Sequence, residues 1–226
     1  QLPPGYELVL YDARGHGRSD SPTDGYDLAT QAEDLAGAIA ALGLEKPALL
    51  GHSLGAEAAL VLAGAHPQLL RGIVLEDPGP WWMGWPATDE EKTALTVMRE
   101  RYEQYPHLPR EVLLADRRQR SPNWTEGERA AWVDAKLRAS QHAFAVFDPE
   151  LDAGIDWPTV LSRITCRALL IHTDVATGGM VGPESVATLQ ALVPHLAIAH
   201  IPGASHSIRR SNLTHFMAVV GRFLAS

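Results

Sequence analysis

A chain of 226 residues can form one domain, or a domain with an inserted lid, and its hydrophobic content of 46% can supply a sizeable core. The formal net charge of −8 argues against nucleic-acid binding, and the one basic cluster (Arg117, Arg118 and Arg120) is interpreted as a solvated helix face. A single cysteine, Cys166, excludes an internal disulfide framework, and no apolar run reaches the roughly 18 residues of a membrane span. No secretory signal is visible, and the cytoplasm is the expected location.

Apolar strand patterns alternate with helical spacing along the chain. Strands are predicted at Tyr6–Tyr11, Ala48–Leu50, Gly72–Glu76, Ala168–His172 and Leu196–Ile201. Helices are predicted from Leu28 to Leu42, from Leu54 to Ala65, from Pro183 to Leu192 and from Ser211 to Leu224. This alternation predicts an α/β fold, with a mostly parallel sheet and helices on both of its faces.

The middle of the chain has a different pattern. Two capping boxes, at Thr88–Glu91 and Thr125–Glu128, each predict the start of a helix, and no strand pattern interrupts this stretch. We therefore expect residues 81–158 to form a helical cap over the nucleophile described below. Residues 1–80 and 159–226 are expected to form the core that carries the cap.

The tryptophans are confined to this stretch. All six lie between positions 81 and 157, at Trp81, Trp82, Trp85, Trp124, Trp132 and Trp157. Any one of them can be an ordinary core residue, but their clustering in an insertion favours an aromatic substrate pocket. We expect at least one tryptophan to face the substrate, and the candidates are Trp81, Trp82 and Trp85.

One short stretch carries the strongest chemical signal. Gly51-His52-Ser53-Leu54-Gly55 lies between an apolar strand and a helix, which is the setting of a nucleophile elbow. The turn strains the serine backbone, and the two glycines are expected to let strand and helix pack closely. The Leu54 N–H is the predicted oxyanion donor. His52 is adjacent to the nucleophile, but the strained turn is expected to point its side chain away from Ser53. The alternative for Ser53 is a serine that merely caps the following helix.

Three motifs in this order resemble the α/β-hydrolase superfamily. Residues 12–19 are similar to its D-x-R-G-x-G-x-S loop, here interpreted as a hydrogen-bonded structural loop, and residues 51–55 to its nucleophile elbow. Gly203-Ala204-Ser205-His206 resembles the turn that carries the family histidine after the last strand. Because a serine hydroxyl needs a base to take its proton, His206 is the expected base for Ser53.

The acid that orients the histidine has two candidates. The usual family position follows the strand that ends at His172, where the family pattern places its aspartate at Ala176, and Asp174 lies two residues early. A second family position follows the strand after the elbow, where Glu76 and Asp77 lie. Haloalkane dehalogenases and zearalenone-lactonase-like hydrolases resemble this second arrangement. We favour Asp77 and keep Asp174 as the alternative.

The resemblance implies a serine hydrolase that cleaves a small, fairly apolar ester or lactone. A carbon–carbon bond hydrolase of the meta-cleavage type is the alternative enzyme, and a ligand receptor or pseudo-enzyme is the alternative from another class. The serine at the elbow argues against haloalkane dehalogenase and epoxide hydrolase activities, because both need an aspartate nucleophile. No cofactor or metal is expected, because His-Glu-x-x-His and Cys-x-x-Cys motifs are absent and the glycines at 15 and 17 do not form a dinucleotide fingerprint.

Part of the family pattern has no counterpart in the sequence. The strands that the family places before Tyr6–Tyr11 are missing, and so is the His-Gly loop that supplies a second oxyanion donor. A central strand left at an edge exposes unpaired backbone groups. We therefore expect an N-terminal segment or a second chain to complete the sheet beside Tyr6–Tyr11.

Overall fold

The computed structural model describes residues 5–225, and the chain divides into two compact units. The first unit consists of Gln1–Leu8, Leu28–Trp85 and Ile155–Ser226, and the second of Val9–Asp27 and Pro86–Gly154. The second unit contains most of the expected cap, residues 81–158. It also contains residues 9–27, which the sequence pattern places with the core.

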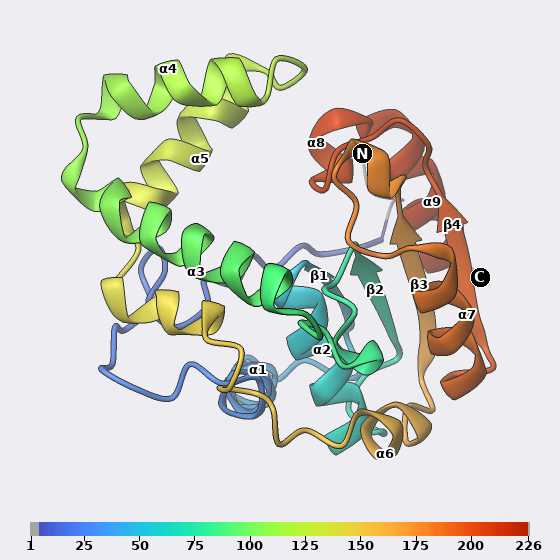
Figure 1. Ribbon diagram of the computed structural model, residues 1–226. Helices are drawn as coiled ribbons and strands as arrows, with labels where there is room; N and C mark the ends of the chain where they lie inside the picture. The colour runs from blue at the N-terminus through green and yellow to red at the C-terminus, as the bar shows by residue number, and fades with distance from the viewer. Residues whose placement is uncertain (1–4, 226) are drawn as a thin grey trace. The chain divides into compact units, whose positions relative to one another are not determined.

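The first unit is built on a parallel sheet of four strands (Figure 1). The strands are β1 (Ala48–His52), β2 (Gly72–Glu76), β3 (Arg167–His172) and β4 (Leu196–His200), and their order in the sheet is their order in the chain. The helices of this unit are α1 (Leu28–Ala41), α2 (Leu54–Ala65), α6 (Trp157–Ser162), α7 (Pro183–Leu192), α8 (Ile208–Ser211) and α9 (Leu213–Ala225). Short 3-10 turns lie at η1 (Trp81–Met83) and η4 (Val175–Thr177).

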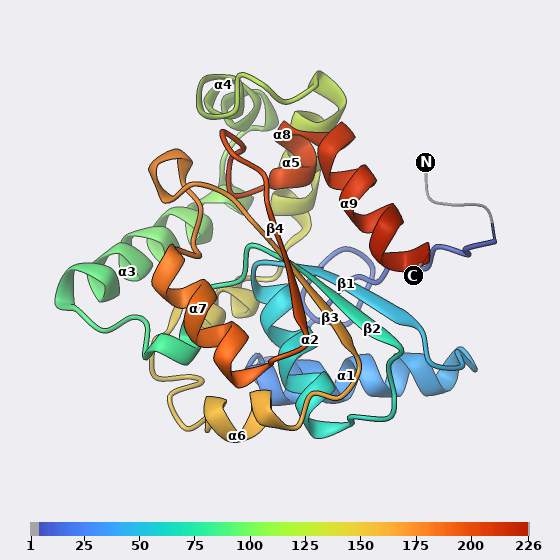
Figure 2. The ribbon, with the colours of Figure 1, turned by 90° about the vertical axis from the view of Figure 1, so that its right-hand side faces the viewer.

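Alternate side chains of the central strands point to opposite faces of the sheet, as strand geometry requires. Ile73 and Leu75 of β2 join the larger apolar core with α1, α2, α6 and α7, whereas Val74 joins a smaller core with α8 and α9. Figure 2 shows α1 and α2 on one side of the strands and α9 on the other. Both faces are therefore covered, which explains why the central strands read as continuous apolar runs.

The strand predicted at Tyr6–Tyr11 is wrong, because no residue from 6 to 11 is in a strand in the structure. The Tyr6 hydroxyl donates a hydrogen bond to the Leu224 carbonyl, and the Arg71 guanidinium lies 4.9 Å from the Tyr6 ring centroid. Leu8 and Leu10 are exposed, at 66% and 86%. An apolar run becomes a strand only when a neighbouring strand pairs with its backbone, and no described strand lies beside this one.

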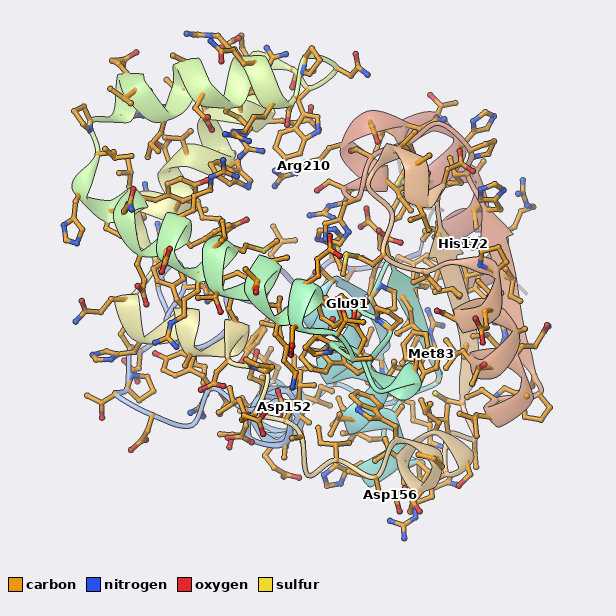
Figure 3. The ribbon with its side chains drawn as sticks, in the orientation of Figure 1. Met83, Glu91, Asp152, Asp156, His172 and Arg210 are labelled. Atoms are coloured by element: carbon orange, nitrogen blue, oxygen red, sulfur yellow. The ribbon has the colours of Figure 1, made fainter. Side chains whose placement is uncertain are left out.

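The second unit is helical. It contains α3 (Asp89–Gln104), η2 (Tyr105–His107), α4 (Arg110–Arg120), α5 (Glu126–Arg138) and η3 (Gln141–Phe147). Both predicted capping boxes are confirmed, because Thr88 and Thr125 each exchange hydrogen bonds with the glutamate three residues on, and Glu91 is labelled in Figure 3. No helix in the described part of the chain is long and apolar enough to cross a membrane.

The basic cluster of α4 is only partly a solvated face. Arg118 and Arg120 are exposed and form ion pairs with Glu126 and Asp116. Arg117 differs, because its guanidinium lies 3.7 Å from the Trp132 ring centroid, and burial lowers the pKa of this arginine. The core of this unit thus combines aromatic rings with a cation, an arrangement that stabilises more when water is excluded.

The loop at residues 12–20 is held by its own hydrogen bonds. The Asp12 carboxylate accepts from the Arg18 N–H at 3.0 Å, and the Asp12 carbonyl accepts from the Ser19 hydroxyl. Gly17 has a φ of +56°, and a Cβ there would lie 2.1 Å from the Asp12 carboxylate. These contacts support the interpretation of this motif as a structural loop.

Candidate active site

Ser53 sits on the turn between β1 and α2 with φ 51° and ψ −124°, a conformation that costs energy for a non-glycine residue. Its N–H donates to the Glu76 carbonyl at 2.9 Å, so the end of β2 holds the turn in place. A Cβ at Gly51 would lie 2.2 Å from the Gly55 carbonyl oxygen, so only glycine fits at position 51. The strained turn predicted from the sequence is therefore present.

The two glycines of the motif are not equivalent. A Cβ at Gly55 meets no described atom within 4 Å, so close packing of strand on helix requires Gly51 and not Gly55. Leu54 is the first residue of α2. Its N–H belongs to the first turn, where helix geometry leaves the amide groups without partners inside the helix. The oxyanion role of this N–H stays a prediction.

Asp77 follows β2 and is one of three described non-glycine residues with positive φ, at 45°. Its side chain is fully buried, and its Oδ2 lies 2.7 Å from the His206 Nδ1. The Met180 N–H also donates to this carboxylate, at 3.1 and 3.2 Å from its two oxygens. The buried Glu57 of α2 accepts from the Gly79 N–H at 2.7 Å and so supports the loop that carries Asp77.

His206 lies in the turn after β4, between Asp77 and His52. The rings of His52 and His206 are 4.6 Å apart, and the His52 Nε2 lies 3.0 Å from the His206 carbonyl oxygen. His52 therefore contacts both the ring and the backbone of His206. Burial, followed by the charges of His206 and Arg209, lowers the pKa of His52 well below 6.5, so this ring is a neutral neighbour of the nucleophile.

Asp174, the alternative acid, contacts a different histidine. Its Oδ1 lies 2.8 Å from the His200 Nε2, and its Oδ2 accepts from the Gly203 N–H at 2.7 Å. The His200 ring stacks on His172, which ends β3 and is labelled in Figure 3. Asp174 therefore braces the turn that leads to His206, and of the two candidate acids only Asp77 contacts the His206 ring.

The sequence analysis missed the ion pair beside this site. Glu76 is fully buried, and its carboxylate binds Arg209 through both the backbone N–H and the guanidinium. Two acidic residues at the end of an apolar strand, and an arginine three positions after the candidate base, were the available signals. Neither shows by itself that the two segments meet.

The three candidate pocket tryptophans have different positions. Trp82 is 7% exposed, belongs to the larger core and donates from Nε1 to the Ser185 carbonyl at 2.9 Å. Trp82 is thus a core residue, because its indole N–H already donates a hydrogen bond inside the protein. Trp81 and Trp85 are half-buried, with ring centroids 5.1 Å apart in an edge-to-face arrangement, and the pocket role stays a prediction for these two.

Among the described residues, no group of three or more histidine, cysteine, aspartate or glutamate side chains is arranged to hold a metal ion.

The family model for the α/β hydrolase fold matches residues 1–208. This chain belongs to the α/β-hydrolase fold family. The fold class predicted from the sequence is thereby confirmed, and the protein is an α/β hydrolase.

Relatives with known names are similar to this α/β hydrolase along most of its length. The 2-(acetamidomethylene)succinate hydrolase of Mesorhizobium japonicum is 26% identical over 214 residues, covering 90% of this chain and 73% of the relative. The N-formylmaleamate deformylase of Pseudomonas putida is 28% identical over 232 residues, covering 97% and 79%. A crystal structure of E-2-(acetamidomethylene)succinate hydrolase has a TM-score of 0.79 at 24% identity, covering 95% of this chain and 80% of that one.

Proposed function

We propose that this α/β hydrolase cleaves a small, fairly apolar carboxylic ester or lactone through an acyl-enzyme on Ser53. The observation that carries the proposal is the 2.7 Å contact between the His206 Nδ1 and the buried Asp77 carboxylate. The strained serine turn adjoins Asp77, because the Ser53 N–H is bonded to the carbonyl of the residue before it. The same turn adjoins His206 through His52, whose ring lies 4.6 Å from that of His206. In this proposal Ser53, His206 and Asp77 are the nucleophile, the base and the orienting acid.

The contact sets the direction of proton transfer. A carboxylate only accepts hydrogen bonds, so the His206 Nδ1 carries the proton and its Nε2 is left free to act as a base. The Nε2 takes the proton of the Ser53 hydroxyl as its oxygen attacks the substrate carbonyl, and it then gives this proton to the leaving alcohol. The Leu54 N–H faces the oxyanion. In the second half of the reaction the His206 Nε2 takes a proton from water as the water oxygen attacks the acyl-enzyme, and it returns this proton to the Ser53 oxygen as the acid leaves.

The substrate side of the proposal rests on residues 81–85 and on the helical unit. Trp81 and Trp85 offer two half-buried aromatic rings a few residues beyond Asp77 in the chain, which suits a fairly apolar small molecule. We propose that the helices from α3 to η3 act as the cap. Trp85→Ala tests the aromatic part of the proposal, because loss of this ring is expected to raise KM more than it lowers kcat.

The test is a panel of p-nitrophenyl esters and lactones of increasing acyl length, assayed with the wild-type protein and with Ser53→Ala. We expect turnover by the wild type, a preference for short acyl groups, and loss of at least about 10³-fold in kcat for Ser53→Ala. A fluorophosphonate probe should label the wild type and not the variant. Equal activity of the two proteins would reject Ser53 as the nucleophile.

Amide hydrolysis is a second candidate. It is favoured by the names of the two relatives, a 2-(acetamidomethylene)succinate hydrolase and an N-formylmaleamate deformylase, because both names describe N-acyl substrates. An N-formyl or N-acetyl amide of the same acyl length as the best ester separates the candidates. A higher kcat/KM for the amide would favour the second.

The same panel tests the two remaining alternatives. A dienone substrate followed by its absorbance detects carbon–carbon bond hydrolysis, and turnover of the dienone without turnover of esters would favour that enzyme. A folded protein that neither turns over a substrate nor reacts with the fluorophosphonate would favour a receptor or pseudo-enzyme. Each outcome therefore selects a different reading of the same site.

A further inference from the structure

Glu76 connects the nucleophile turn to the histidine turn. Its carbonyl accepts from the Ser53 N–H at 2.9 Å. Its side chain, with no exposed surface, accepts at Oε1 from the Arg209 N–H at 2.9 Å and at Oε2 from the Arg209 Nη1 at 2.6 Å. Arg209 belongs to α8, which begins two residues after His206.

Two consecutive carboxylates hold the same segment. Asp77 binds the His206 ring, and Glu76 binds Arg209 three residues further on. Neighbouring residues of an extended strand point to opposite faces of a sheet. The φ of 45° at Asp77 interrupts the extended chain directly after Glu76, and both side chains thereby reach residues 206–209.

A purely stabilising role explains this ion pair poorly. The Glu76 side chain has no exposed surface, whereas that of Arg209 is 32% exposed. Desolvation makes a buried carboxylate costly, and a well-packed apolar residue in its place often serves stability as well or better. Here burial raises the pKa of Glu76, while the guanidinium and the backbone N–H of Arg209 act in the opposite direction. Apolar residues could not supply the two directed hydrogen bonds that Glu76 makes to Arg209, in the segment after His206.

We propose that Glu76 and Arg209 are positioning residues that hold His206 in register with Asp77 and Ser53. This inference rests on the proposed function of the same site. Neither residue needs to touch the substrate. Loss of these hydrogen bonds lets the His206 turn move, and a displacement of about 1 Å at a reacting group can cost about 10²-fold in rate.

The primary test is Glu76→Gln, which keeps the shape of the side chain and removes its charge. We expect kcat to fall by about 10- to 100-fold and KM to change by less than about 2-fold, with a parallel fall in the rate of Ser53 phosphonylation. Glu33→Gln is the control, because it makes the same substitution at an exposed residue of α1 whose carboxylate contacts His66, and it should leave kcat unchanged. Folding of each variant is checked by circular dichroism.

Arg209→Lys is the second variant, and it keeps the test open if Glu76→Gln does not fold. Lysine preserves the charge and the backbone N–H but lacks the planar guanidinium, so we expect a smaller loss in kcat of about 3- to 10-fold. Wild-type kcat in both folded variants would overturn the proposal. If Glu76→Gln misfolds and Arg209→Lys folds, a wild-type kcat in Arg209→Lys is sufficient to overturn the proposal.

A double-mutant cycle distinguishes positioning from general destabilisation. If Glu76 acts through the His206–Asp77 contact, Glu76→Gln should change kcat by less than about 2-fold when Asp77 is already asparagine. The same fold-loss in both backgrounds would overturn the proposal. The proposed function is tested separately, because activity that survives Ser53→Ala rejects that function whatever Glu76→Gln does.

Discussion

Two histidine–aspartate pairs stand at the carboxyl edge of the sheet. His206 and Asp77 are 2.7 Å apart, and His200 and Asp174 are 2.8 Å apart. The Asp77 side chain has no exposed surface, whereas that of Asp174 is 38% exposed. Hydrogen-bond length alone therefore does not separate a candidate catalytic pair from a structural one, and burial does.

The surroundings explain this contrast. Asp77 is fully enclosed, takes a strained backbone conformation and has a second donor in Met180. Asp174 directly precedes η4, is partly exposed, and ties His200 and Gly203 together at the start of the histidine turn. In the proposed site, the loop after β2 supplies the acid and the loop after β3 supports the histidine turn.

The largest expected effect tests this difference in role directly. Asp77→Asn should lower kcat by about 10⁴-fold, because an amide at this position no longer selects the His206 tautomer that has a free Nε2. Asp174→Asn should lower kcat by less than about 10-fold, because the His206 ring keeps its own partner. Steady-state kinetics on the best ester measures both, and the reverse ranking would exchange the two assignments.

The next effect concerns how the loop after β3 supports the histidine turn. Thr173 is 1% exposed, and its hydroxyl lies 2.8 Å from the Ile201 carbonyl oxygen and 3.1 Å from that of Ala204. Thr173→Val removes this donor from the buried Ile201 carbonyl, whereas the Ala204 carbonyl keeps the Thr177 hydroxyl. The loss should lower the free energy of unfolding by about 1–3 kcal/mol. Denaturant unfolding measures the change. Thr165→Val is the matched control, because it removes an exposed hydroxyl that donates to the Pro67 carbonyl at 2.9 Å, and a larger loss there would contradict the prediction.

A pH dependence of stability near neutrality should belong to His52, whose ring lies beside that of His206. The pKa of His52 is lowered in the folded protein from 6.5, so its contribution to stability is complete above pH 6.5 and is lost as the pH falls below it. The loss amounts to at most about 1.4 kcal/mol per pH unit for one such group. His52→Gln should therefore flatten the decline in unfolding free energy between about pH 7 and about pH 5. An unchanged decline would mean that other histidines cause it.

The smallest effect should belong to the exposed pair and should disappear in acid. The Gly203 N–H is the main cause that lowers the pKa of Asp174 below 3.8 in the folded protein, and His200 adds to it. The stabilisation is present above pH 3.8 and is lost as the pH falls through the lowered pKa. Asp174→Asn should thus be slightly less stable than the wild type at neutral pH and equal to it in strong acid. A constant difference in thermal midpoint across this range would contradict this.

Much of the framework could be predicted from local patterns. Four of the five predicted strands are present, the helix Pro183–Leu192 has its predicted bounds, and both capping boxes are formed. The failed strand, Tyr6–Tyr11, has the same apolar composition as the others. It fails because pairing with a neighbouring strand is not a property of the segment itself.

The sequence by itself determined the strained turn at Ser53, the histidine turn and a short choice of acids, because these depend on glycine spacing and on the alternation of strands and helices. Only the tertiary structure decided which acid contacts His206. That contact depends on the positive φ of one residue, Asp77, and on the burial around it. The Glu76–Arg209 pair was likewise beyond the sequence, since it joins segments far apart in the chain through side-chain directions that packing alone sets.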